Sequence, residues 1–452
     1  MKTFLLLFIS VSFAPFINVS PVLAAPVADA LVGVPLVARW QTYKSQFGNG
    51  ELKTNLVPTG LYKDIACTQP ALSAGDSVAA VRDEISAGKL TFTQSDVAKC
   101  ATLQFVAKRP VLRFDGIDDC YLLSTDLPLA NLDLWARYKI NTPPTTEYVT
   151  VVSGSTNGEP DYASAGGFYL PVQDLQRSTA QNIMQVVHLN GTNGSGAVFV
   201  EGVPIHAGKF SSGITSQLCL GARLAPSPAS YLAMDLEALI IGQAVPPEKY
   251  ALVDKYLGAH LDAPRLVCVG DSITDGTAGS EGLHATEEYP SQLQLLRPQR
   301  FVINSGQWGA TISSVLPVSQ QFSPDAQLIV FIGTNDLARD KTAEATFAEL
   351  SAYCRARRDE GWKVYVATIL PRRFGGDSRV SADFETKRQA LNTAIRDQHA
   401  AFADGLIDFA ADERIGDIGD EKNTEYFSPD QVHLSAKGAR VLAEIAHAAL
   451  PK

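Results

Sequence analysis

Patterns that define several common classes of protein are missing from this chain of 452 residues. It has no Lys/Arg tract and its formal net charge is -10, so nucleic acid is not expected as a partner. Its six cysteines include no Cys-x-x-Cys pair, which removes the commonest zinc-binding spacings. After the first residues, no run approaches the roughly twenty apolar residues that cross a membrane. The composition is that of a globular protein.

The first residues differ from the rest. Met1 and Lys2 precede an apolar run over residues 4–16, and small residues follow at 22–25. A short cationic start, an apolar centre and a small-residue cleavage site are typical of a secretory signal peptide. We therefore expect residues 1–24 to be removed and the protein to be secreted or periplasmic.

That route permits disulfides among the cysteines. Four of them lie in the N-terminal part, and four cysteines allow three connectivities. A bond between Cys67 and Cys100 is favoured because the two bracket one long segment without strand character. Cys268, inside an apolar run, is expected to be a buried thiol.

The length exceeds what one hydrophobic core usually supports, so two domains are expected, with a boundary near Ala263. From about residue 111 to residue 242, short β-rich runs alternate with Gly, Pro, Asn and Ser clusters, which predicts an all-β sandwich or jelly roll for the domain at residues 25–262. A helix at 246–260, opening on two prolines, is expected to close this part. The expected strands are 111–114, 132–140, 148–152, 167–172, 184–189, 197–203, 218–224 and 236–241.

In residues 264–452 the pattern changes. Unbroken apolar runs at 266–269, 301–303, 328–332 and 364–369 are separated by helix-like stretches. Such runs are typical of parallel strands covered on both faces. The C-terminal part is therefore predicted to be a three-layer α/β/α sandwich with a parallel sheet, in which ligands bind at the carboxyl ends of the strands.

Three of those strands are followed by residues suited to acyl chemistry. Ser272 leaves the first strand within Gly-Asp-Ser; its hydroxyl needs a base to act as a nucleophile, and its backbone N–H, at a helix start, can point at an oxyanion. Gly309 can bring another N–H close to a substrate, and the Asn335 amide can supply a third donor. Each alone also fits an ordinary loop, a glycine-rich turn or an Asx turn.

Among the seven histidines, His433 stands out because Asp430 precedes it by three residues on a tight turn. The carboxylate can bind one imidazole nitrogen and fix the tautomer, while the other nitrogen faces a serine. This pair supplies a base and its orienting group together.

Taken in order, the segments around Ser272, Gly309, Asn335 and Asp430/His433 resemble the four sequence blocks of the SGNH, or GDSL-type, hydrolases. The resemblance covers about residues 265–452 and implies a flavodoxin-like fold. It implies Ser272 as nucleophile, His433 as general base then acid, and Asp430 as the orienting carboxylate. It further implies an oxyanion hole made by the backbone N–H groups of Ser272 and Gly309 with the Asn335 side chain, and no metal or organic cofactor. The fourth block departs from the family's common proline-following form, which leaves the triad untouched.

The N-terminal part is similar, less specifically, to laminin-G-like, concanavalin-A-type jelly rolls, through segments such as 110–119 and 199–202. Such modules often bind glycans, some with calcium, and many are only structural. Asp115, Asp118 and Asp119 offer oxygen ligands for calcium, although a turn between two strands is the favoured interpretation.

The function expected from these patterns is a secreted serine esterase that removes a small acyl group, acetyl above all, from a carbohydrate or another small ester. The alternatives are a lipase, lysophospholipase or thioesterase of the same family, a carbohydrate O-acyltransferase, and a non-catalytic glycan-binding protein. Trp308 and Arg372 follow the second and fourth apolar strands and are candidates for substrate contacts, with packing and a solvated loop as their alternatives.

Overall fold

The computed structural model describes residues 31–43, 56–142, 150–155, 168–171, 184–258, 264–276, 287–315, 325–373 and 380–451, apart from residues 87, 126, 129–130, 193–194, 210–213, 216, 225–227 and 230. The expected signal peptide and the expected boundary at Ala263 lie outside these residues. Within them, no helix is long and apolar enough to cross a membrane.

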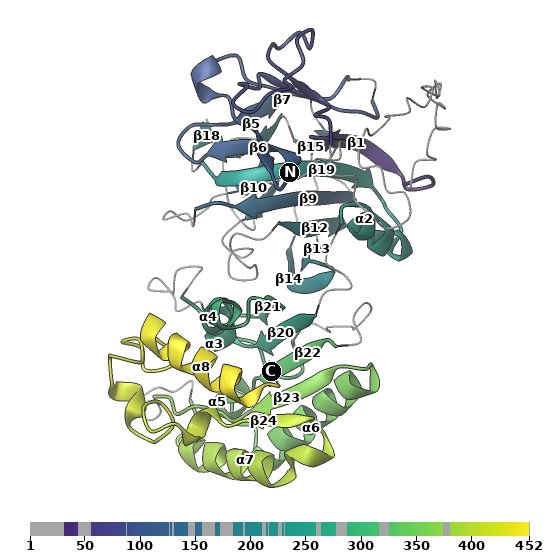
Figure 1. The fold of residues 1–452 in the computed structure, drawn as a ribbon. Helices are drawn as coiled ribbons and strands as arrows, with labels where there is room; N and C mark the ends of the chain where they lie inside the picture. Colours follow the sequence, from purple (N-terminus) through teal and green to yellow (C-terminus); the bar gives the residue numbers. More distant parts are fainter. Residues whose placement is uncertain are drawn as a thin grey trace, which may run out of the picture.

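Most strands of the N-terminal region belong to two antiparallel sheets (Figure 1). The larger sheet runs β14 (Val203–Lys209), β13 (Ser195–Val200), β12 (Gln185–Thr192), β9 (Leu132–Ile140), β19 (Ala233–Gln243), β6 (Arg109–Asp115) and β5 (Thr102–Val106), and β1 (Leu36–Gln41) also pairs with β19. The smaller sheet runs β11 (Phe168–Pro171), β10 (Thr150–Ser155), β16 (Gln217–Leu220), β7 (Tyr121–Leu123), β4 (Thr91–Thr93), β3 (Ala80–Arg82) and β2 (Leu61–Tyr62). Two short pairs join β15 (Ile214–Thr215) to β8 (Leu127–Pro128) and β17 (Arg223–Leu224) to β18 (Pro228–Ala229).

The central strands of the larger sheet are buried on both faces. Along β9, Leu134, Ala136 and Tyr138 join the main hydrophobic core. Trp135 points to the opposite face, where a second cluster also holds Val253 of α2 (Tyr250–Tyr256). Successive side chains of a strand alternate between faces, so the helix gives the outer face of the sheet a core of its own.

The expectation of a mostly β N-terminal region is confirmed, while the jelly-roll arrangement stays a prediction. The helix expected at 246–260 is shorter, a 3-10 turn at Pro247–Lys249 followed by α2. The strands that were not expected are β1 to β5, β7, β8, β14, β15 and β18. Most of them are two or three residues long, and the longer β1, β5 and β14 carry polar residues, proline or glycine. The reason for preferring a Cys67–Cys100 bond is wrong, because the segment between the two cysteines contains β3 and β4. Both are free thiols in this structure, and the Cys100 thiol donates to the Asp96 carbonyl at 3.4 Å.

The C-terminal region has the predicted parallel sheet. Its five strands run β21 (Phe301–Gly306), β20 (Arg265–Gly270), β22 (Gln327–Phe331), β23 (Lys363–Ala367) and β24 (Gly405–Ile407). Every residue of β20, β21 and β22 is buried, which explains their unbroken apolar character. The fifth strand, β24, escaped the sequence pattern because it is three residues long and begins with glycine.

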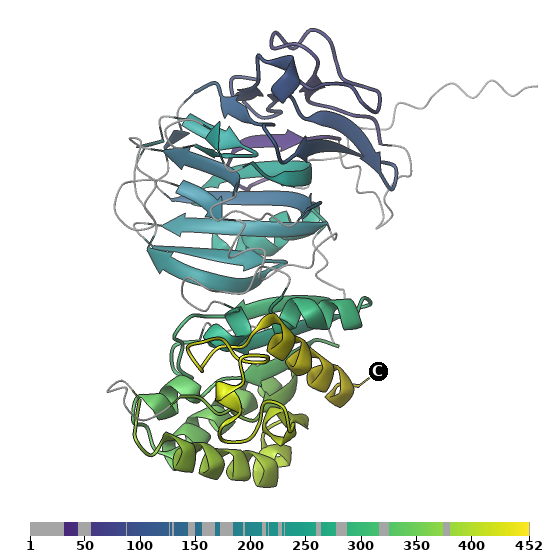
Figure 2. The same cartoon turned by 90° about the vertical axis from the view of Figure 1, so that its left-hand side faces the viewer.

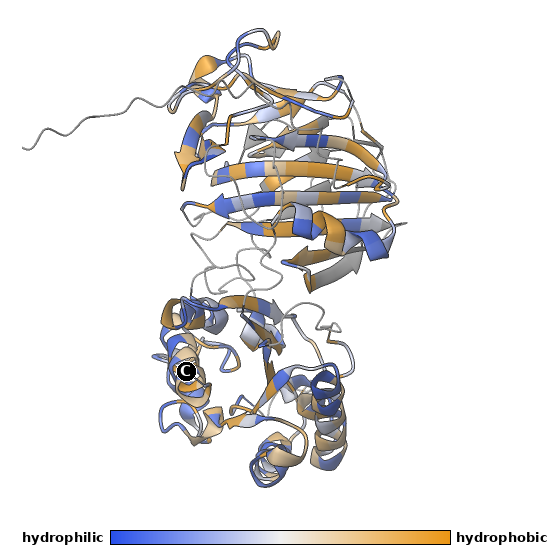
Figure 3. Ribbon diagram, turned by 45° about the vertical axis from the view of Figure 1, so that its right-hand side comes forward, coloured by the Kyte–Doolittle hydropathy of each residue, from blue (hydrophilic) through white to orange (hydrophobic). Residues whose placement is uncertain are grey.

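Helices cover both faces of this sheet (Figures 1 and 3). α4 (Tyr289–Leu296) packs on α8 (Ala436–Ala449), and α6 (Ala343–Asp359) packs on α7 (Phe384–Gln398). Two short helices, α3 (Ser272–Asp275) and α5 (Thr334–Ala338), follow the carboxyl ends of β20 and β22. Short 3-10 turns lie at Val97–Lys99, His399–Ala401, Phe409–Ala411 and Asp420–Lys422.

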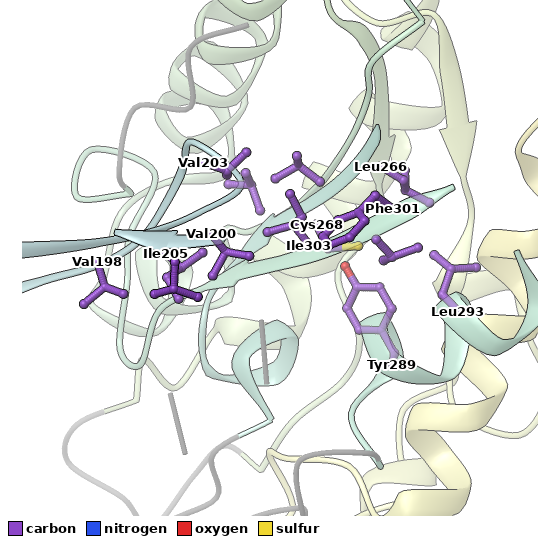
Figure 4. Close-up of a cluster of buried hydrophobic side chains, with 14 of the residues drawn as sticks. Val198, Val200, Val203, Ile205, Leu266, Cys268, Tyr289, Leu293, Phe301 and Ile303 are labelled. Atoms are coloured by element: carbon purple, nitrogen blue, oxygen red, sulfur yellow. The ribbon is translucent and has the colours of Figure 1, made fainter. Parts of the chain in front are cut away.

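The two regions stack end to end, with the larger N-terminal sheet above the parallel sheet (Figure 2). Edge strand β14 of the upper sheet contacts edge strand β21 of the lower one. The apolar side chains of Val203 and Ile205 join Phe301 and Ile303 in one buried cluster (Figure 4). The two regions therefore share a continuous hydrophobic core at an edge that would otherwise expose unpaired strand groups.

Polar contacts cross the same junction. The Ser305 hydroxyl on β21 donates to the Pro204 carbonyl at 3.0 Å, and the Arg265 guanidinium at the start of β20 donates to the Glu201 carbonyl at 2.7 Å. Both strands that approach the candidate site are thus anchored to the N-terminal region.

Candidate active site

Ser272 is the first residue of α3, directly after β20. Asp271 caps this helix, accepting from the Ile273 N–H at 3.0 Å. The turn is tight, because a Cβ at Gly270 would lie 2.0 Å from the Thr274 hydroxyl oxygen and 2.5 Å from the Phe331 carbonyl oxygen. The first N–H groups of a helix have no acceptor within the helix, so the Ser272 N–H is available to an anion.

The Ser272 hydroxyl lies 2.8 Å from His433 Nε2, although 161 residues separate the two in sequence. His433 Nδ1 lies 2.5 Å from an Asp430 carboxylate oxygen. The other Asp430 oxygen accepts the backbone N–H groups of Val432 and His433 at 2.9 and 3.0 Å. The structure therefore brings the three residues singled out in the sequence into one chain of hydrogen bonds.

The environment keeps Asp430 ionised. Burial raises its pKa, but the hydrogen bonds from the His433 side chain and from two backbone N–H groups outweigh burial and hold the pKa well below its usual range. An ionised carboxylate fixes a proton on Nδ1 and leaves Nε2 as the acceptor toward Ser272.

Gly309 lies in a turn that follows β21. The Ala310 N–H donates to the Gln307 carbonyl at 3.1 Å, and Gly309, third in this four-residue turn, has a φ of +68°. A left-handed φ at that position favours glycine. The Gln307 N–H binds the Gly270 carbonyl at 3.1 Å, which ties the turn to the end of the strand that precedes Ser272.

Asn335 comes from α5 and reaches the same turn. Its amide donates one hydrogen bond to the Ala310 carbonyl at 2.9 Å, which fixes the plane of the carboxamide. An amide carries two donor hydrogens, so the second remains for another acceptor. Gly309 and Asn335 are thus held together, and the turn's bond to Gly270 joins them to the segment that carries Ser272.

Several supporting residues were missed by the motif analysis. Arg339 donates to the Gly309 carbonyl at 2.9 Å, and Asp336 accepts the Ile312 N–H at 3.1 Å. Two side chains thus support the turn at residues 307–310 and the segment after it; this turn is called the oxyanion turn below because the sequence predicts that its Gly309 N–H binds an oxyanion. The Arg373 N–H donates to the Gln431 carbonyl at 2.8 Å, which ties the loop after β23 to the histidine turn. In the sequence, these residues are marked only by their closeness to a motif, and that is too weak a signal to identify them.

Asp271 carries a perturbed carboxyl next to the candidate nucleophile. Burial raises its pKa to about 6, partly offset by the hydrogen bond from Ile273 and by the charges of His433 and Arg372. A carboxyl that gains a proton close to neutrality adds less negative charge beside a developing oxyanion than a fully ionised one.

The two candidate substrate contacts are placed differently. Trp308 is the second residue of the oxyanion turn, and the exposed fraction of this residue is 75%. Arg372 is half-buried, with its guanidinium 5.8 Å from the Phe384 ring centroid and 3.5 Å from the Thr334 hydroxyl. Trp308 therefore faces solvent beside the site, whereas the Arg372 side chain contacts Phe384 and Thr334.

One cluster of carboxylates lies far from this site. Among the described residues, Asp115, Asp118 and Asp119 are the one group whose carboxylates lie close enough to hold a metal ion. Asp115 accepts the N–H groups of Ile117 and Asp118, and Asp119 accepts the Asp115 N–H at 2.7 Å. These bonds are those of a turn between β6 and β7, the structural alternative expected from the sequence.

Comparison with known proteins gives a family for the C-terminal region. Residues 268–441 match the GDSL-like Lipase/Acylhydrolase family. No curated protein matches the chain. Among solved structures, a lipolytic protein of the G-D-S-L family from Veillonella parvula DSM 2008 is 18% identical, covering 40% of this chain and 95% of its own, with a TM-score of 0.31. A lipase/acylhydrolase from Enterococcus faecalis is 20% identical, covering 42% of this chain and 98% of its own, also with a TM-score of 0.31. Residues 268–441 of this chain are a GDSL-like lipase/acylhydrolase domain.

Proposed function

We propose that this protein is a secreted serine esterase that removes acetyl groups from an acetylated carbohydrate. The observation that carries the proposal is the hydrogen-bonded chain from Ser272 through His433 to Asp430. In this proposal His433 Nε2 takes the Ser272 proton as the hydroxyl oxygen attacks the ester carbonyl carbon. The N–H groups of Ser272 and Gly309 and the Asn335 amide donate to the resulting oxyanion.

The second half of the reaction reverses the proton transfers. His433 donates its proton to the departing alcohol oxygen, which leaves an acyl group on Ser272. Water then loses a proton to Nε2 and attacks the acyl carbon, and the acid leaves as Ser272 regains its proton. Apart from the ester and water, the groups used in these steps all belong to the chain.

The proposed carbohydrate substrate is supported by Trp308. An exposed indole beside the oxyanion turn offers a flat apolar face, which suits the C–H face of a sugar ring. The acetyl group is the small acyl substituent that such a sugar ester would carry. Glycan binding by the N-terminal region stays a prediction.

The first test is hydrolysis of the p-nitrophenyl esters of acetate, butyrate and octanoate by wild type and Ser272→Ala. We expect the acetate ester to be preferred and kcat to fall by about 10⁴-fold or more in the variant. Ser313→Ala, which removes an exposed hydroxyl from the loop after β21, is the matched control and should keep full activity. Turnover that survives Ser272→Ala would reject the nucleophile, and an octanoate preference would favour a lipase.

The carbohydrate part is tested by Trp308→Ala. Loss of a stacking face should lower kcat/KM for glucose pentaacetate about tenfold, a change of about 1.4 kcal/mol, and leave that for ethyl acetate unchanged. Trp308→Phe should restore most of the loss, and Phe105→Ala, at an exposed aromatic on β5, is the control. Equal losses on both esters would reject a sugar platform. Acetyl transfer to added saccharide in place of water would identify an acyltransferase.

A further inference from the structure

A small buried cluster in the N-terminal region contains two cysteines and is separate from both hydrophobic cores. Cys120 and Cys219 are packed with Ala222, and Leu122 and Tyr231 cover them. The exposed fractions of the two cysteines are 5% and 0%. Each thiol shifts the pKa of the other, as expected for close neighbours.

The sheet places the two cysteines on one face. β7 and β16 are antiparallel, with Leu122 opposite Cys219 and Tyr121 opposite Leu220. Cys120 precedes Leu122 by two residues, and residues two apart on an extended chain point to the same side. Cys120 is therefore the diagonal cross-strand neighbour of Cys219, a position within reach of its side chain.

The two thiols are not equivalent. The hydrogen bond with Cys219 lowers the pKa of the Cys120 thiol, against the effect of burial, while the same bond and burial raise the pKa of Cys219. The Gln94 amide also donates toward the Cys120 sulfur at 3.7 Å. Donors directed at a sulfur favour its thiolate, the nucleophilic form in disulfide exchange.

We propose that Cys120 and Cys219, held as neighbouring thiols in this structure, become joined by a disulfide in the mature protein. The Cys120 thiolate attacks a sulfur of a low-molecular-weight or protein disulfide, which forms a mixed disulfide and expels one thiolate. The Cys219 thiolate then attacks the Cys120 sulfur and expels the second. Two protons and two electrons pass from the cysteine pair to the oxidant, which is reduced to two thiols.

The bond would add a covalent link where two neighbouring strands of the smaller sheet are paired over a short length. β7 links the β16 side of this sheet to the β4 side, and it pairs with β16 through only two residue pairs. The cysteines are 99 positions apart in sequence, so the bond would close a long loop of the unfolded chain. Long loops give the largest entropic stabilisation in the chain-entropy model.

The other cysteines are placed for different roles. Cys100 donates its thiol to the Asp96 and Gln94 carbonyls, and Cys67 donates toward Ile65 on a turn. Cys268 and Cys354 are buried in the C-terminal region, as expected for Cys268. The proposal therefore predicts one disulfide and four free thiols.

The proposal is tested on the full chain refolded with reduced and oxidised glutathione. After denaturation without a reductant, maleimide should label four thiols, and after reduction all six. Peptide mapping without reduction should recover the Cys120 and Cys219 peptides joined, 2 Da lighter than their sum. Six labelled thiols before reduction, or a bond from either cysteine to another residue, would overturn the proposal.

Variants give a second readout. Cys120→Ser and Cys219→Ser should each lower Tm by about 5 °C or more and remove the effect of a reductant on Tm. Cys100→Ser, at the nearby buried thiol, should keep that effect, and esterase activity at low temperature should be unchanged in all three. A reductant effect that persists in Cys120→Ser would assign the bond elsewhere and reject the pair.

Discussion

At the scale of single residues, Asp430 accepts two backbone N–H groups and also orients the His433 imidazole. One substitution of similar size can test the second role by itself. Asp430→Asn keeps an acceptor for the backbone N–H groups but presents the imidazole with a neutral amide. We expect kcat to fall about 10³-fold or more, because the wrong tautomer of His433 is stabilised. Since the pKa of Asp430 is held well below its usual range, the carboxylate itself should add no titration to the pH–rate profile between about pH 5 and 9.

The control for this prediction is Asp397→Asn, at an exposed carboxylate on α7, which should leave kcat unchanged. A loss smaller than tenfold in Asp430→Asn would mean that another group orients the imidazole.

A substitution at Gly309 can test whether its backbone N–H contributes to catalysis, because it changes the turn without removing a side chain. The nearest atom that an added Cβ would meet is an Arg339 nitrogen at 3.6 Å, so space is available, but the φ of +68° is unfavourable for alanine. Gly309→Ala should therefore cost about 1 to 2 kcal/mol of local strain and shift the N–H from its position. We expect kcat to fall about tenfold or more with KM little changed, measured by steady-state kinetics on the acetate ester. Unchanged kcat would remove the Gly309 N–H from the oxyanion hole.

At the scale of strands and helices, sequence patterns found the parallel strands because each is buried on both faces and reads as an unbroken apolar run. They missed β24 and, in the N-terminal region, β1 to β5, β7, β8, β14, β15 and β18, most of which are too short to carry a period that distinguishes them from loops. The same limit applies to the site. Ser272 and His433 were found from local motifs, but the contact between β14 and β21 joins residues about 100 positions apart and has no local signature.

That contact has a measurable consequence. Ile205 belongs to the N-terminal sheet but is buried in the cluster shared with β21. Ile205→Ala should cost about 2 to 5 kcal/mol and speed the thermal inactivation of the esterase, although the residue lies outside the hydrolase domain. Leu103→Ala, an equally buried truncation on β5 at the opposite edge of the same sheet, should speed inactivation less. Equal effects of the two variants would mean that the junction contributes nothing special to the hydrolase domain.

At the scale of the whole molecule, a buried carboxyl on α2 responds to the charged residues at the junction of the two regions. Asp254 on α2 accepts the Trp135 indole N–H at 3.1 Å and is fully surrounded by protein. Burial raises its pKa to about 7, the charge of Glu201 adds to the increase, and the charge of Arg265 opposes it. Glu201 and Arg265 are also the residues that join the regions, so the titration of Asp254 reports on the junction.

Asp254 should make the molecule less stable as the pH rises. In the unfolded chain this carboxyl loses its proton near about pH 4, whereas in the folded protein it keeps the proton up to about pH 7. Between these values the folded state binds more protons, so the free energy of unfolding falls as pH increases, and the contribution is lost above the folded pKa. Asp254→Asn keeps an acceptor for Trp135 and removes the titration, so its Tm should exceed that of wild type most at pH 8, and the difference should shrink as the pH falls and vanish only below about pH 4.

Asp235 should change the free energy of unfolding with pH in the opposite direction to Asp254. Burial raises its pKa, but hydrogen bonds from Arg113 and Asn141 outweigh burial and lower the pKa below its usual value. The stability that Asp235 contributes is present above the unfolded pKa and is lost as the pH falls through the folded value. Asp235→Asn should therefore reduce Tm most at neutral pH, where Asp254→Asn raises it. Thermal melts of both variants between about pH 2.5 and 8 cover both titrations, and a parallel shift of either variant over this whole range would mean that its carboxyl does not titrate as these contacts require.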